Sequence, residues 1–174
     1  GHPVLSSLEG FAGLSSIGGT FMIGFSTSPD NQSNYSTSYL MNLSGLDALT
    51  HAGAIHIDAN PQLVSLQGLN QLTTVTNYIH LADNPRLENL QALANLTTVS
   101  TFSLQGNTRL RNLQGLEQVR NLDYLTIKGR VSTTPETPAA EGLNSLTGIE
   151  SAGSIKHLNL TGNPLQDRSA LNNV

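Results

Sequence analysis

Two histidines occupy matching positions in two copies of a short alternating pattern. His56 lies in the segment Ala-Ile-His-Ile-Asp, and His80 lies in Tyr-Ile-His-Leu-Ala. Imidazole nitrogens bind transition metals, and the carboxylate of Asp58 is a further donor close by. The spacing fixes no third ligand, and histidines also occur together on surfaces that hold no metal. We therefore expect no metal or cofactor, and keep a metal-assisted site at His56 and His80 as an alternative hypothesis.

The chain carries no motif for covalent or phosphoryl chemistry. It has no Gly-rich phosphate loop, no His-Glu-x-x-His and no Gly-x-Ser-x-Gly. The acids Glu88, Glu117 and Asp123 fall at different positions of the sequence repeat, so the spacing pairs none of them. We therefore expect a protein that is not an enzyme.

The composition excludes several classes of partner. The net charge is −4 with a pI near 5.6 and no basic run, which argues against nucleic acid and against adhesion to anionic membranes. No apolar stretch has transmembrane length, and there are no cysteines for disulfides or thiolate chemistry. Charged residues make up only 11% of the chain. Because polarity comes instead from Asn, Ser, Thr and Gln, we expect an extracellular or cell-surface protein. We also expect a monomer within a longer chain.

A leucine-rich repeat positions these residues. Its copies begin at Leu40, Leu63, Leu87, Leu110 and Leu143, at spacings of 23, 24, 23 and 33 residues. A degenerate copy begins at Leu5 and a partial one at Leu165. A fixed period of this size predicts a solenoid. We expect one domain over residues 1–174, with insertions at residues 24–39 and 130–142 that form either a binding rim or tolerated loops.

Each part of the repeat predicts a local structure. Pairs such as Ile79/Leu81 predict a short strand, and the strands of successive copies should stack into parallel sheets. The Leu-x-x-Leu-x-Gly-Leu stretch favours a tight or 3₁₀ turn. The segment 72–75 is rich in Thr and Val and predicts a third, extended side. Four glycines are expected to supply positive φ at a corner, namely Gly45, Gly68, Gly115 and Gly148.

Asparagines recur just after the expected strands. They are Asn60, Asn84, Asn107 and Asn163. We interpret them as a structural ladder, because stacked asparagines can bond the backbone groups that a turn leaves unpaired. The fifth copy has Arg130 in this position, where the second insertion begins.

The run Asn60-Pro61-x-Leu63-x-x-Leu66-x-Gly68-Leu69-x-x-Leu72-Thr73-x-Val75-x-x-Tyr78-Ile79-x-Leu81 resembles the receptor L-domain family. The resemblance covers nearly the whole chain. It implies a mainly β fold, a right-handed leucine-rich β-solenoid of about six coils with parallel sheets, and a binding role at the cell exterior. The animal receptors of this family contain cysteines, so the absence of cysteine favours a bacterial surface protein, with a fungal one as the alternative. Internalin-type leucine-rich repeats are the nearest alternative.

The residues between the apolar strand positions should point outward and form columns across the sheet. The central column is Met22, His56, His80, Ser103, Thr126 and Asn159. The preceding column is Thr20, Ala54, Tyr78, Thr101, Tyr124 and His157, and the following one is Gly24, Asp58, Ala82, Gln105, Lys128 and Thr161. The candidate ligand-binding residues on this face are His56, Asp58, Tyr78, His80, Tyr124 and Lys128.

Two functions remain open at this point. The first is a non-catalytic adhesion or recognition module for an extracellular protein or glycan, since tyrosines give contact area at a small cost in entropy. The second is a structural spacer within a larger surface protein, in which the sheet face is only solvated. The sequence favours the first.

Overall fold

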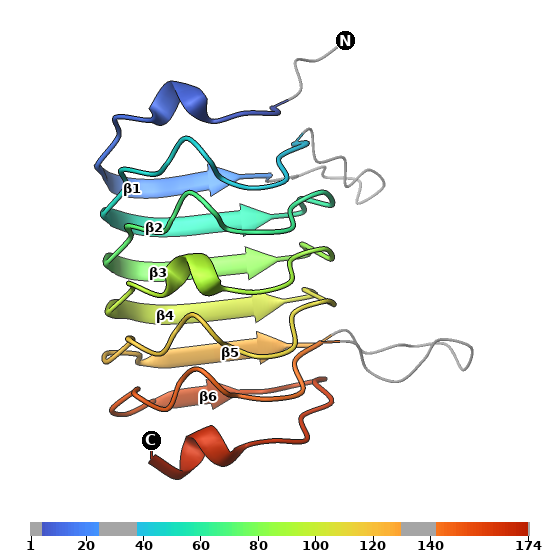
Figure 1. Ribbon diagram of the computed structural model, residues 1–174. Helices are drawn as coiled ribbons and strands as arrows, with labels where there is room; N and C mark the ends of the chain where they lie inside the picture. The colour runs from blue at the N-terminus through green and yellow to red at the C-terminus, as the bar shows by residue number, and fades with distance from the viewer. Residues whose placement is uncertain (1–4, 25–37, 130–141, 174) are drawn as a thin grey trace, which may run out of the picture.

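The computed structural model describes residues 5–24, 38–129 and 142–173, and in them six strands form one sheet (Figure 1). The strands are β1 (Ser16–Ile23), β2 (His51–Asp58), β3 (Thr74–Ala82), β4 (Thr98–Gln105), β5 (Tyr124–Lys128) and β6 (His157–Asn159). They lie in sequence order, and each is parallel to its neighbours. The expected mainly β fold with parallel strands is confirmed. The arrangement is compatible with a β-solenoid.

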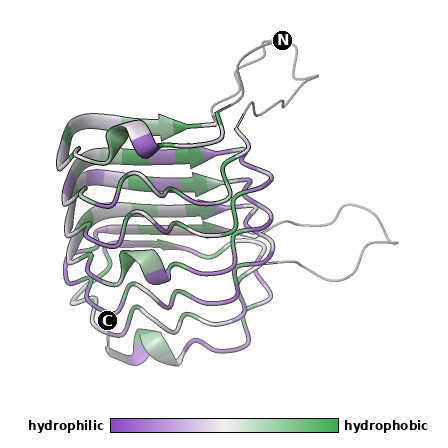
Figure 2. Ribbon diagram, turned by 45° about the horizontal axis from the view of Figure 1, so that its top comes forward, coloured by the Kyte–Doolittle hydropathy of each residue, from purple (hydrophilic) through white to green (hydrophobic). Residues whose placement is uncertain are grey.

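The core lies between the strands and the segments that return from one strand to the next. Figure 2 shows the strands on one side of the molecule and the returning segments on the other. Ile79 and Leu81 of β3 are 1% and 0% exposed, and the repeat leucines such as Leu66 and Leu72 are buried from the other side. The apolar-x-apolar pairs therefore point inward as expected, although burial is less complete at the two ends of the stack, where Phe21 is partly buried and Leu158 is 41% exposed.

The Thr- and Val-rich segments belong to the same sheet as the strands that follow them. Thr74 and Val75 are the first residues of β3, and they pair with Thr98 and Val99 of β4. The register shifts between Val75 and Tyr78, so a bulge bends the strand without ending its pairing. The segment is extended as predicted, but the expectation of more than one sheet is wrong. No glycine or proline separates it from the strand, so nothing in the sequence ends the strand there.

The predicted glycine corners are confirmed. Gly45, Gly68, Gly115 and Gly148 have φ values of 106°, 111°, 110° and 115°. A Cβ atom at Gly68 would also overlap the carbonyl of Leu43 in the preceding copy. These positions therefore require glycine for two reasons, the backbone conformation and the close approach of the neighbouring copy.

Short 3₁₀ helices form where a copy lacks this positive-φ glycine corner. They are η1 (Glu9–Phe11), η2 (Gln91–Leu93) and η3 (Ser169–Asn173). In η2 the corner position is Ala92, and in η3 it is Ala170. An alanine cannot adopt the positive φ without strain, so in these two copies the turn tightens into a 3₁₀ helix instead. In η1 the corner residue is Gly10, which does not have a positive φ, so this reason does not apply there. Among the described residues, no helix has the length and apolar character needed to cross a bilayer.

Most of the two expected insertions, residues 25–37 and 130–141, lies outside the described residues. At the margins of the first, Ser38 is buried and forms a parallel bridge with Leu5, whereas Tyr39 is 59% exposed.

Candidate functional site

The register of the sheet brings the predicted central column into line. Met22, His56, His80, Ser103, Thr126 and Asn159 are paired successively from β1 to β6. In particular, His56 of β2 lies directly beside His80 of β3, as the repeat predicted. The buried residues before and after His80 fix this pairing register, because a slip of one residue would turn Ile79 and Leu81 outward.

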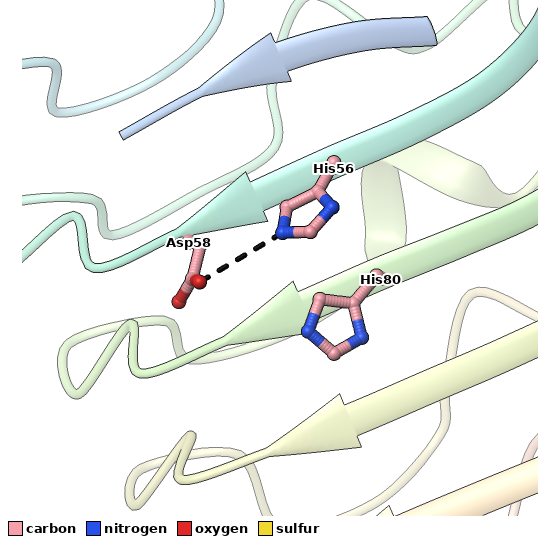
Figure 3. Close-up of side chains that lie close together, drawn as sticks. All are labelled: His56, Asp58 and His80. Carbon is pink, nitrogen blue, oxygen red and sulfur yellow. Dashed lines mark ion pairs between the residues drawn. The ribbon is translucent and has the colours of Figure 1, made fainter. Parts of the chain in front are cut away.

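His56, Asp58 and His80 converge on one point of the outer face (Figure 3). The two imidazole rings have centroids 4.7 Å apart and are tilted by 57°. His56 Nε2 lies 3.7 Å from Asp58 Oδ2, and the side chains of His56 and Asp58 are 16% and 26% exposed. One ligand atom from each of the three residues lies within 4.8 Å of the others. The cluster is half-buried and still open to solvent.

Tyr78 joins this cluster from β3. Its ring meets the ring of His56 edge to face, with centroids 6.4 Å apart and an interplanar angle of 81°. An edge-to-face arrangement is favourable for two aromatic rings, so Tyr78 belongs to the same group of side chains.

The local environment favours the neutral form of His80. Partial burial lowers the pKa of His80 below its usual value, and the neighbouring His56 lowers it further. Asp58 and Asp83 oppose this shift, and Lys128 adds to it. Burial penalises the charged imidazolium, so the form favoured at His80 is the one whose ring nitrogen can accept a proton or a metal.

The other two candidate residues lie apart from this cluster. Tyr124 of β5 is separated from Tyr78 by β4, so the two side chains are two strand spacings apart, about 10 Å. Tyr124 is 44% exposed, and its ring stacks on the ring of His157 at a centroid distance of 4.5 Å. Lys128 is exposed at the end of β5. The structure thus groups four candidates and leaves Tyr124 and Lys128 as a second region of the same face.

The outward columns are less uniform than expected. Ala54 and Ala82 were placed on the outer face, but they are 1% and 4% exposed, because larger neighbours cover their small side chains. His157 was in a predicted column but not among the candidate residues, although it forms the ring stack with Tyr124. The ion pair of Lys156 with Asp123, at 2.9 Å, was not predicted, since neither residue lies at a repeated polar position.

The asparagine ladder is present in the central copies. The main-chain N–H of Asn60 donates to Asn84 Oδ1 at 3.1 Å, and that of Asn84 donates to Asn107 Oδ1 at 3.2 Å. The Asn84 side-chain amide also donates to the carbonyl of Ile57 at 3.0 Å. These three asparagines are buried, and their side chains bond main-chain groups of neighbouring copies.

Asn163 continues the ladder across the interrupted fifth copy. Its amide donates to the carbonyl of Ile127 at 2.7 Å, but the side chain is only partly buried. A cavity of about 10 Å³, lined in part by Asn107, Gly129 and Asn163, lies beside the interruption. This volume is enough for about one water molecule.

No family model, curated protein or solved structure gives a significant match to this chain. The resemblance to receptor L-domains therefore stays a prediction from the repeat, and the site has to be interpreted from its own chemistry.

Proposed function

We propose that this chain is a non-catalytic recognition module that acts outside the cell, at a cell surface, and binds a protein or glycan through the outer face of its sheet. The observation that supports this most is the grouping of His56, Asp58, Tyr78 and His80 on adjacent strands. Rings with polar edges and a carboxylate are typical of binding surfaces, because they offer apolar contact and hydrogen bonds together.

The second region of the face extends this surface. Tyr124 is exposed and backed by the ring of His157, which restricts its motion before any partner arrives. A side chain that is ordered beforehand loses less entropy on binding. Lys128, exposed at the strand end, would add a positive charge for an acidic or polar group of the partner.

In architecture, we propose a right-handed leucine-rich β-solenoid of about six coils, similar to receptor L-domains. The parallel strands in sequence order and the buried asparagines support it. Right-handed connections between parallel strands are the general rule. A bacterial cell-surface origin and an adhesion role belong to the same proposal, and rest on the polar, uncharged composition and the lack of cysteine.

The test is a comparison of binding by two triple variants. The wild type, Tyr78→Ala/His80→Ala/Tyr124→Ala, and a control with Gln67→Ala/Gln71→Ala/Gln118→Ala are immobilised separately. The three glutamines are exposed and lie in the segments that return between strands, away from the sheet face. Each protein is then presented with a glycan array and with a bacterial surface-protein extract.

We expect a partner that the wild type and the glutamine control both retain and that the sheet-face variant loses. Far-UV circular dichroism must first show that the three proteins fold alike. Retention of the same partner by the sheet-face variant would contradict the proposed surface.

A structural spacer within a larger surface protein is the second candidate. One observation favours it: the first and last described segments lie at opposite ends of the stack (Figure 1), so the strands could hold two attached parts at a distance. If none of the three proteins retains a glycan or a protein, this function becomes the better supported of the two.

A further inference from the structure

We propose that His56, Asp58 and His80 form a binding site for a divalent transition metal of the zinc class. The inference goes beyond the recognition function and does not rest on it. It starts from the convergence of two imidazoles and one carboxylate on neighbouring strands (Figure 3). Two histidines and one carboxylate, with a water or a partner group as fourth ligand, are a donor set that zinc uses in proteins.

The distances fit a single ion after small side-chain rotations. Zinc binds His nitrogen and carboxylate oxygen at about 2.0–2.2 Å, so tetrahedral ligand atoms lie about 3.3 Å from each other. His56 Nε2 and Asp58 Oδ2 are already 3.7 Å apart, and all three donor atoms lie within 4.8 Å. We expect rotation about the side-chain bonds to close the remaining gap.

The backbone beneath the cluster is held firmly. β2 and β3 are interior strands of the sheet, each paired on both sides. His56 and His80 are direct partners in the ladder, and Asp58 follows His56 by two residues on the same face. The inward residues that follow each histidine, Ile57 and Leu81, are fully buried and fix the register. The three donors therefore stay together in the folded protein, which lowers the cost of assembling a site.

An ion pair between a protonated His56 and Asp58 would explain two of the three residues. It gives no account of His80, which lies beside His56 on the adjacent strand. The ring of His80 lies 4.7 Å from that of His56 between centroids, so both imidazoles are available to one ion. A bound dication would engage all three groups at once, because a carboxylate oxygen and two imidazole nitrogens can all donate to it.

The donor chemistry decides which metals fit. Two imidazole nitrogens favour Zn²⁺, Ni²⁺, Co²⁺ or Cu²⁺, whereas Ca²⁺ and Mg²⁺ prefer oxygen ligands throughout. The side chains of His56 and Asp58 are partly exposed, so the cluster can be reached from outside. A metal here would keep one position for water or for a group of another molecule, as open zinc sites do.

The direct test is isothermal titration of the whole chain with zinc chloride at neutral pH, after treatment with EDTA. We expect one zinc site per chain, competition by Ni²⁺ and Co²⁺, and no competition by Ca²⁺. Mutation of a residue that only hydrogen-bonds a zinc ligand lowers the affinity for zinc by about 10- to 100-fold. Loss of a ligand itself, in His80→Asn or Asp58→Asn, should therefore weaken zinc binding by at least about 100-fold.

The matched control is His157→Asn, which removes a histidine from the same face but outside the cluster. We expect it to bind zinc as the wild type does. Because a variant can fail for lack of folding, the side-chain NMR signals of the wild-type histidines provide a second measurement. Zinc should shift the signals of His56 and His80 and leave that of His157 in place. Absence of zinc binding by the wild type, or equal binding by His80→Asn, would overturn the proposal.

Discussion

Replacement of Asn84 by alanine tests whether the asparagine ladder stabilises the stack. Asn84 is 0% exposed and its side chain takes part in four hydrogen bonds. Its amide donates to the carbonyls of Ile57 at 3.0 Å and Ala82 at 2.9 Å. Its Oδ1 accepts from the main-chain N–H of Asn60 at 3.1 Å and from the Asn60 side chain at 3.2 Å.

The expected loss of stability depends on which hydrogen bonds the partners of Asn84 retain after the substitution. Four buried hydrogen bonds at about 1 kcal/mol each give about 4 kcal/mol. The carbonyl of Ala82 still accepts from the N–H of Ala59 at 3.0 Å, which reduces the loss. The N–H of Asn60 loses its acceptor in the dry interior, which adds about 1–3 kcal/mol. With about 1 kcal/mol subtracted for Ala82, we therefore expect Asn84→Ala to lower the free energy of unfolding by about 4–6 kcal/mol.

Asn163→Ala is the matched control. Its side chain is only partly buried and makes two hydrogen bonds, to the carbonyls of Ile127 and Thr161. Because water can replace bonds at an exposed position, we expect a cost of about 1 kcal/mol. The chain has no tryptophan, so urea unfolding is followed by far-UV circular dichroism. If Asn84→Ala cost no more than Asn163→Ala, the ladder would not hold the copies together.

Three further substitutions test the turns. Gly68→Ala should lower the free energy of unfolding by about 3 kcal/mol in a urea titration, because φ is 111° and the new Cβ would overlap the carbonyl of Leu43. Ala59→Gly should raise the melting temperature slightly, because Ala59 has φ of 53°, a conformation that costs alanine about 1 kcal/mol; a lower melting temperature would argue against strain at this corner. Hydrogen bonds from Ser169, chiefly from its main-chain N–H, lower the pKa of Asp167, so this carboxylate should contribute stability above its usual pKa of 3.8 and lose it as the pH falls further. The urea midpoints of the wild type and Asp167→Asn should accordingly differ at neutral pH and converge in acid, and a constant difference would contradict this assignment.

The parts of the fold that could be predicted from the sequence are those that repeat. Ile79 and Leu81 alternate with outward residues, so their burial and the pairing of His56 with His80 followed from the period alone. Glycine recurs at the positions equivalent to Gly68, and asparagine at those equivalent to Asn84. Such recurrence indicates a positive-φ corner for the glycine and a turn-capping side chain for the asparagine.

The parts that could not be predicted depend on contacts outside the period. The bulge after Val75 joins two segments that we expected to be separate sides into one strand. It could not be predicted, because a β-bulge without glycine or proline leaves no signal in the sequence. The residue two positions after a corner glycine has the same role in different copies but differs in type. Asn70 and Glu117 both accept a hydrogen bond from the glycine N–H. An amide and a carboxylate perform the same function there, so the repeat hides it.

The outer face is the part of the molecule that the architecture leaves free to vary. Ser103 and Thr126 occupy the same column as His80, on strands that pair in the same way, so the sheet does not require histidine at this position. Inside the stack the opposite holds, because Leu104 and Ile127 must be apolar as Leu81 is. His56 and His80 are therefore not explained by folding, and neither is the edge-to-face contact with Tyr78. Substitution of His80 by serine, the residue found on the next strand, should leave the free energy of unfolding nearly unchanged while removing zinc binding. That combination would separate the chemistry of this face from the stability of the sheet that carries it.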